Sequence, residues 1–248
     1  MPKIQFNPQF IYKNPHKAYG EFRQKVVTNV NKSQQINCDS FYAEFKTFTE
    51  AFGKRKKAQE LNIISRSLIE FLVSKNQDHL AGIAYSVLIK MNENNPKVVE
   101  DLALKALAIA TRFNDPVHKM ARANDLINLY SKSERGGDKH VKYLRIANRA
   151  LMDICKNYDK SVKARYKSVS REVRPLENYE LLLCDTKLKI AKYTAENEIS
   201  NARYELEEAK KLYEKNKNSS IEESIKILAE RIASVEYKIS KIEANKKS

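Results

Sequence analysis

The residues best suited to chemistry in this sequence are six cations that recur at helical spacing within one short segment. Steps of four, three, four, four and three residues separate them, so on a continuous helix they would share a face. They are Lys156, Lys160, Lys163, Lys167, Arg171 and Arg174. A helix over 156–174 would present them along about 27 Å, enough to follow a phosphate backbone or an acidic helix. The alternative is the solvated polar face of an ordinary amphipathic helix.

The charge of the whole chain is compatible with both interpretations. The formal net charge is +15, and it is concentrated in residues 1–175, which hold 32 Lys and Arg against 17 Asp and Glu. Residues 176–248 hold 14 of each kind. A basic surface attracts nucleic acid, anionic membranes or acidic protein partners. A compositional bias toward lysine explains the same excess without any partner.

Residue types that carry catalysis or bind metals follow no known motif spacing here. The four histidines are scattered, and no glycine-rich phosphate loop occurs. No serine or cysteine stands in a nucleophile motif. Three cysteines lack metal-ligand and redox spacing: Cys38, Cys155 and Cys184. The sequence therefore predicts a non-enzymatic protein that uses no cofactor and no metal.

Helices must position these residues, because helical periodicity runs through most of the chain and glycine and proline are few. Four helices that form two successive pairs are predicted at 78–92, 96–113, 116–132 and 139–157. Ala103 and Leu107 in the first pair match Ala147 and Leu151 in the second, at an interval of 44 residues. Such an interval, holding two helices, is typical of helical-hairpin arrays.

Within these pairs the details resemble the tetratricopeptide repeat. Gly82 and Tyr85 have its glycine-to-tyrosine spacing, and Leu126 and Tyr130 have its leucine-to-tyrosine spacing. The second-helix pattern of that repeat and its closing proline are matched by Ala103, Leu107, Ala110 and Pro116. The resemblance covers about residues 78–159 and implies a helical-repeat scaffold. This sequence departs from the repeat in two respects. Asp78 stands where the repeat has an aromatic residue at the start of its first helix, and extra residues separate the helices of each pair.

The resemblance also implies a concave face, formed by the first helix of each pair, that binds extended peptides. Mapped by the tyrosine positions, this face includes His79, Asn124, Asn128 and Lys132. Asn124 and Asn128 lie one turn apart, so their amides could hydrogen-bond a peptide backbone. The alternative is that they are ordinary exposed polar residues in an asparagine-rich chain.

The predicted fold class is all-α, with an α-solenoid-like body of helical-hairpin repeats followed by a C-terminal antiparallel coiled-coil-like hairpin. Four segments are expected: an extended arm over 1–16, a helical layer over 17–77, the repeat body with the basic helix over 78–175, and a long helical hairpin over 176–248. In the helical layer, an aromatic stripe at helical spacing is expected to form core: Phe41, Phe45, Phe48 and Phe52.

The last segment carries seven aliphatic residues in an unbroken heptad pattern, which we call the seam. They are Ile221, Ile225, Leu228, Ile232, Val235, Ile239 and Ile242. Such a seam must pack on another helix. We expect it to fold back on residues 176–216, as one long helix or two collinear ones with an irregular step at Ile199. A homodimer through 221–242 is the alternative.

These patterns predict a cytoplasmic adaptor or scaffold that binds protein partners through its helical-repeat surface. Nucleic-acid binding through the basic helix 156–174 is the alternative function. The N-terminus has no apolar leader-like run, and no stretch of about 18 apolar residues occurs, so no membrane partner is expected.

Overall fold

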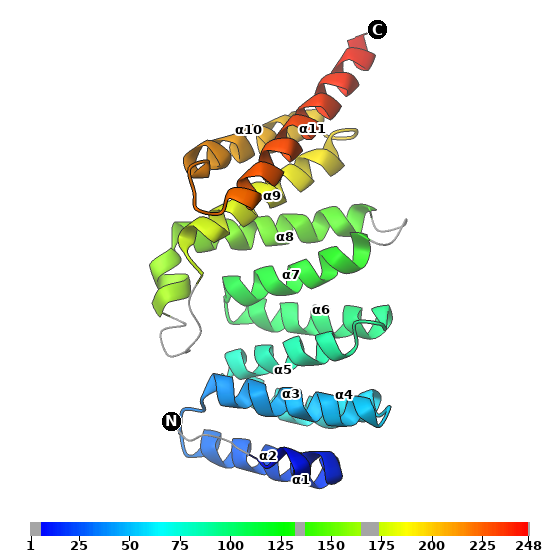
Figure 1. Ribbon diagram of the computed structural model, residues 1–248, viewed down its shortest axis with the longest axis vertical. Coiled ribbons are helices and arrows are strands. Elements are labelled where there is room, and N and C mark those ends of the chain that lie inside the picture. The colour runs from blue at the N-terminus through cyan, green and yellow to red at the C-terminus, as the bar shows by residue number, and fades with distance from the viewer. Residues whose placement is uncertain (1–5, 132–136, 165–173, 248) are drawn as a thin grey trace. The chain divides into compact units, whose positions relative to one another are not determined.

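The computed structural model describes residues 6–131, 137–164 and 174–247. These residues form helices, with no strand among them (Figure 1). The predicted all-α class, in which consecutive helices pack as hairpins, is confirmed. The chain divides into two compact units, one that ends at Asn114 and one that begins at Asp115. This division falls inside the predicted repeat body, between its two pairs of helices.

The described residues of the first unit form α1 (Pro8–Lys13), α2 (Pro15–Asn31), α3 (Cys38–Lys54), α4 (Ala58–Ser74), α5 (Asp78–Met91) and α6 (Pro96–Arg112). Those of the second unit form α7 (Pro116–Ser131), α8 (Gly137–Lys156), the π-helical segment η1 (Asp159–Ala164), α9 (Leu176–Thr194), α10 (Ile199–Asn216) and α11 (Glu222–Lys247). The predicted helical pairs correspond to α5 with α6 and α7 with α8, and each pair packs together within its own unit.

Several helices start with proline in the first turn. Backbone N–H groups have no intrahelical acceptor in that turn, so proline, which has no N–H, is tolerated there, and the preceding polar residue can cap the turn. The side chain of Asn95 accepts from the backbone N–H of Val98 at 3.4 Å, at the start of α6. Asp115 does the same for His118 at 3.0 Å, at the start of α7. The starts predicted at Pro96 and Pro116 are confirmed.

The extended arm predicted over 1–16 is wrong for residues 8–13, which form α1. The same cap-and-proline signal operates there, since the side chain of Asn7 accepts from the backbone N–H of Gln9 at 2.9 Å. Ile11 is fully buried and anchors the short helix. Pro15 then starts α2 instead of ending an arm. Residues 1–5 lie outside the described residues.

An aromatic cluster forms the core of the first unit. The four phenylalanines of the α3 stripe are fully buried, as their spacing predicts. Their rings meet two aromatic residues of α2, with centroids 5.3 Å apart for Phe22 and Phe48 and 5.4 Å apart for Tyr19 and Phe48. The Tyr19 hydroxyl donates to Ser65 Oγ of α4 at 3.1 Å, so the cluster ties three helices together.

The seam forms the inner face of α11. Its central residues Leu228, Ile232, Val235 and Ile239 are buried against small and aliphatic side chains of α9 and α10. The seam was expected either to fold back on residues 176–216 or to pair with a second copy. In the structure it packs within its own chain. A homodimer through 221–242 would require these side chains to leave their own core.

The residues expected to form one long helix or two collinear helices over 176–216 instead fold back on themselves. After α9 ends at Thr194, the backbone N–H groups of Asn197 and Glu198 donate to the Thr194 carbonyl at 3.2 and 2.7 Å, closing a turn. α10 then packs against α9, and α11 packs on both (Figure 1). The segment predicted as a two-helix hairpin over 176–248 therefore has three helices.

Candidate functional site

The basic segment 156–174 is not the single helix predicted from its spacing. α8 ends at Lys156, and η1 follows as a π-helical segment. Hydrogen bonds from residue i to residue i+5 widen the turn in a π-helix, so side chains three and four residues apart no longer line up as on an α-helix. The described part of the segment, from Lys156 through Lys160 to Lys163, therefore does not continue as one straight α-helical row.

Two of these cations, Lys167 and Arg171, lie outside the described residues. Lys156, Lys160 and Arg174 are exposed. Lys163 is paired locally, because its Nζ lies 2.9 Å from Asp159 Oδ1. This hydrogen bond raises the pKa of Lys163. Asp159 therefore offsets the charge of the row at this position.

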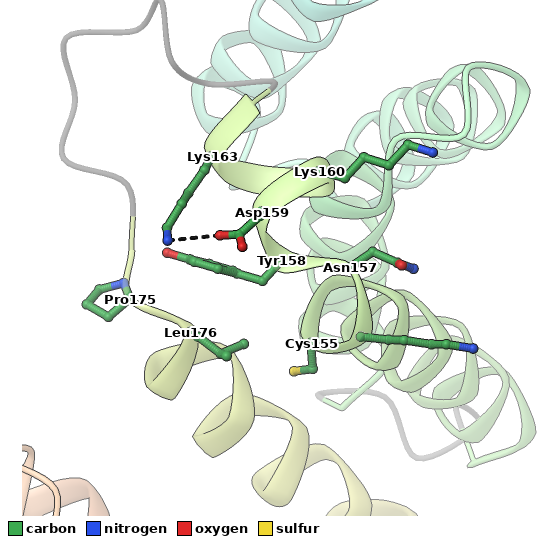
Figure 2. A pocket seen from close by; sticks show the side chains of 9 residues that line it. Cys155, Asn157, Tyr158, Asp159, Lys160, Lys163, Pro175 and Leu176 are labelled. Carbon is green, nitrogen blue, oxygen red and sulfur yellow. Dashed lines mark ion pairs between the residues drawn. The ribbon is translucent and has the colours of Figure 1, made fainter.

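The end of α8, η1 and the start of α9 surround an open hollow of about 690 Å³ (Figure 2). The Tyr158 hydroxyl donates to the Arg174 carbonyl at 2.6 Å and links the two sides. Figure 2 shows the Lys160 side chain directed away from the Lys163–Asp159 pair. Two of the cations that line the hollow, Lys156 and Lys160, thus face solvent.

The thiols in this part of the molecule are poorly suited to nucleophilic chemistry. Burial raises the pKa of Cys155, which lines the hollow, to about 11. Burial raises the pKa of Cys184 to about 12, and its thiol donates to the Ala209 carbonyl at 3.3 Å. Thiols with such high pKa values stay protonated near neutral pH. Since the thiolate is the reactive form, these cysteines are weak nucleophiles.

A row of exposed cations does occur on a regular helix, one element earlier than predicted. We call it the α8 ridge: Lys142, Arg145, Arg149 and Lys156. Steps of three, four and seven residues keep these side chains on one face of α8. Arg145 is paired with Glu198 at 2.6 Å. The sequence contained this signal, but the predicted row began at Lys156 and left the earlier residues out.

The residues predicted to line a peptide-binding face lie in different parts of the structure. His79 is partly buried at the start of α5, in the first unit. Asn124 is partly buried and Asn128 is exposed on α7, in the second unit. Lys132 lies outside the described residues. Asn128 lines a cavity.

That cavity, which we call the α7–α11 cavity, has a volume of about 310 Å³ and is lined by residues of α7, α8, α9 and α11. Ile127, Leu188 and Val235 are buried and give it apolar walls. Asn128 and the exposed hydroxyls of Ser131 and Ser234 add polar groups. Apolar walls with a few polar groups are typical of ligand sites.

Positive charge dominates the cavity. Lys189, Lys192 and Arg231 line it, and no Asp or Glu is among its lining residues. Asp185, outside the lining, pairs with Lys189 at 2.8 Å and also with Arg231. One carboxylate thus offsets only part of the charge of three cations.

His140 is the most buried polar residue of the cavity, with 4% of its surface exposed. Its ring packs edge-on against Tyr193, with centroids 4.5 Å apart, and its Nδ1 lies 3.2 Å from the Ile127 carbonyl oxygen. Burial lowers the pKa of His140; the bond to Ile127 opposes this effect, and nearby Lys189 adds to it. Its neighbours come from helices that are distant in the chain, so no spacing in the sequence marks this histidine.

A carbonyl oxygen can only accept a hydrogen bond, so Nδ1 of His140 must carry the proton. In the neutral ring, Nε2 is then an acceptor. It is buried and has no hydrogen-bond partner among the described residues. The cavity therefore offers surplus positive charge, whereas this acceptor is enclosed by the protein and closed off from the open side of the cavity.

Comparisons with known proteins found no matching family model, no matching curated protein and no matching solved structure. The described helices include none that is long and apolar enough to cross a membrane. Where the structure describes side chains, no three His, Cys, Asp or Glu residues are grouped to hold a metal ion.

Proposed function

We propose that this protein is a non-enzymatic adaptor that binds a segment of a partner protein in the α7–α11 cavity. The observation that carries the proposal is the position of Asn128, an exposed candidate residue at a cavity with apolar walls and a cationic lining. An asparagine amide can both donate to and accept from a peptide backbone. A volume of about 310 Å³ suits one or two anchoring side chains of a segment.

The pairing of α5 with α6 and of α7 with α8 supports a tetratricopeptide-like scaffold as part of this proposal. Surfaces built on packed helices are held more rigidly than surfaces on loops, which favours recognition of short segments. The three cysteines are free, which supports a reducing, cytoplasmic location.

Asn128→Ala should weaken binding of the partner about three- to tenfold, the usual range for one lost hydrogen bond. Partners would be recovered on the full-length protein from the native host, after nuclease treatment, and their affinities then measured for each variant. Asn124→Ala is the matched control, because Asn124 lies one turn away on α7 and does not line the cavity.

Equal losses for the two variants would place the partner along α7 and away from the cavity. Unchanged affinity for both would remove this face from consideration. A loss confined to Asn128→Ala supports the cavity.

A second function, nucleic-acid binding, is favoured by the α8 ridge together with exposed Lys160 of η1. Cations along one helix face can follow a phosphate backbone, and their binding releases counterions. The exposed face of α8 provides the regular α-helical spacing that η1 lacks.

If this surface binds duplex nucleic acid, affinity should fall steeply with salt. Each phosphate contact contributes about −0.9 to the slope of log K against log salt concentration. The double variant Arg149→Glu, Lys156→Glu should therefore make the slope shallower by about 1.8, whereas Lys241→Glu on the exposed side of α11 should not. Binding that is insensitive to both salt and the double variant would rule out the ridge.

A further inference from the structure

The segment that contains α1 is held on the rest of the first unit by contacts of the kind that bind a peptide. At one end, the backbone N–H of Phe6 donates to Oε1 of Glu44 at 3.0 Å. At the other end, Arg55 Nη2 donates to the carbonyl oxygens of Tyr12 and Lys13 at 2.8 and 3.0 Å. These bonds go to the main chain of the segment, so a segment of different sequence could accept and donate them equally well.

Three side chains give the segment its specificity. Ile11 is fully buried where α1 packs on α2 and α3. The half-buried Phe6 ring meets Phe22 and Phe48 edge-on, with its centroid 6.4 Å from each of theirs. The third is Tyr12, so an aliphatic and a second aromatic residue follow the first aromatic residue by five and six positions.

Two lysines favour aromatic residues at both ends of this pattern. Lys25 Nζ of α2 lies 4.1 Å from the centroid of the Phe6 ring, and Lys54 Nζ of α3 lies 4.5 Å from that of Tyr12. A cation is attracted to the face of an aromatic ring, and an aliphatic side chain offers no such contact. The Tyr12 hydroxyl also donates to Oε2 of Glu50 at 2.9 Å, which favours tyrosine at the second position.

The attachment of α1 to the chain allows it to leave. It has six residues, a length at which an isolated helix is not stable in water. A single residue, Asn14, separates it from Pro15, where α2 begins, and proline prevents the two helices from merging. Phe22 and Phe48 hold α2 and α3 together with ring centroids 5.3 Å apart, a contact that does not involve α1.

We infer that the surface of α2 and α3 beneath α1, which we call the α1 site, binds a short helical segment of a partner protein. The segment carries an aromatic residue followed five and six positions later by an aliphatic and an aromatic residue. In the structure, α1 occupies the site in cis and acts as an autoinhibitory contact. The α1 site lies in the first unit and extends the proposed function beyond the α7–α11 cavity of the second unit.

The test uses the full-length protein and a capped peptide that repeats residues 6–13. In the unmodified protein α1 competes with the peptide, because its short link gives it an effective concentration of about 1 mM or more. Ile11→Asp places a carboxylate at a fully buried position and should release α1. The peptide should therefore bind this variant at least about tenfold more tightly than it binds the unmodified protein.

Two controls accompany this comparison. Gln9→Asp makes an acidic change at an exposed position of α1, so α1 should stay docked and peptide binding should remain weak. A peptide with aspartate in place of its isoleucine should bind none of these proteins. A peptide that keeps only the phenylalanine, isoleucine and tyrosine, with alanine elsewhere, should bind Ile11→Asp within about fivefold of the full sequence, because few residues carry most of the binding energy.

A second substitution locates the peptide on the protein. Arg55→Ala, added to Ile11→Asp, should weaken peptide binding about three- to tenfold, since it removes the donor to two carbonyl oxygens. Lys56→Ala removes a charge from the next residue of the same turn, which is also exposed, and should leave the affinity unchanged.

Two measurements on the unmodified protein need no variant. The backbone N–H groups of Ile11 and Asn14 donate to the carbonyls of Asn7 and Phe10 at 3.2 and 2.9 Å. They should exchange at least about tenfold faster than amides in the middle of α2, because only α1 has to leave. Excess peptide should also displace α1 and shift the nuclear magnetic resonance of the Tyr12 ring. If Ile11→Asp unfolds the first unit, this displacement decides the question.

Equal affinity of the peptide for Ile11→Asp and the unmodified protein, binding of the aspartate peptide, or an unshifted Tyr12 ring would overturn the inference. Exchange in α1 as slow as in α2 would do the same. A dimer of the unmodified protein that the peptide dissociates would also overturn it, by showing that the α1 site takes α1 of a second copy. None of these measurements involves Asn128, so they leave the test of the α7–α11 cavity separate.

Discussion

Phe45→Ala is expected to destabilise the first unit by about 3–5 kcal/mol, the usual cost of removing a buried phenylalanine ring. Phe45 is fully buried, and its ring stacks on Phe41 with centroids 5.8 Å apart. It also meets Tyr19 of α2 edge-on at 6.4 Å. Because the surrounding rings are held by two helices, they cannot collapse fully into the space left by the lost ring. Small domains are stable by only about 5–15 kcal/mol, so this change should come close to unfolding the unit.

Chemical denaturation, followed by amide hydrogen exchange in α2, α3 and α4, would measure this loss unit by unit. Ile63→Ala is the control, because Ile63 of α4 keeps 72% of its surface exposed. Its replacement should change the free energy of unfolding by no more than about 0.5 kcal/mol. Similar losses for the two variants would contradict a core centred on the aromatic cluster.

Much of the fold could be predicted because its determinants are local. The starts of α6 and α7 depend on a capping residue followed by proline, and both are visible in the sequence. The aromatic stripe of α3 and the seam of α11 follow from periodicity alone, since a continuous apolar face must be buried. The same signal is present at Asn7 and Pro8, where the structure has a helix instead of the expected extended arm.

The turn between α9 and α10 could not be predicted, because nothing in residues 195–198 marks it. This stretch contains neither glycine nor proline, and Ala195 keeps helical backbone angles. The apolar pattern also continues across the turn, since α9 and α10 both face the core that α11 completes. A chain reversal that keeps the apolar residues on the core side gives the same sequence pattern as an irregular step within one continuous helix.

The candidate site depended on non-local packing to a greater degree than the fold. His140, Tyr193 and Arg231 lie on three helices and meet only when α8, α9 and α11 pack together. No spacing in the sequence connects these residues. The prediction of a basic helix over 156–174 was wrong for a related reason. The structure has a π-helical segment there, together with a hydrogen bond from Tyr158 to the Arg174 carbonyl and a buried Val162. The three-and-four spacing of the cations indicates none of these features.

Ile232→Asp should have the second large effect, because it affects both the core and the cavity. Ile232 keeps only 9% of its surface exposed at the centre of the seam. A carboxylate there loses the apolar contacts and must either be buried without a partner or force α11 away from α9 and α10. We expect a loss of at least about 3 kcal/mol in the stability of the C-terminal helices.

Detachment of α11 would also remove Arg231, Ser234 and Val235 from the α7–α11 cavity, so binding of a partner segment there should be lost together with hydrogen-exchange protection in α10 and α11. Ile227→Asp makes the same chemical change on the same helix at a position that is 40% exposed and does not line the cavity. It should cost no more than about 1 kcal/mol and leave binding intact.

Measurement of mass in solution distinguishes a seam packed within one chain from a seam that joins two chains. A seam buried within one chain predicts a single-chain mass for the unmodified protein, whereas a dimer that dissociates in Ile232→Asp would show that the seam joins two copies.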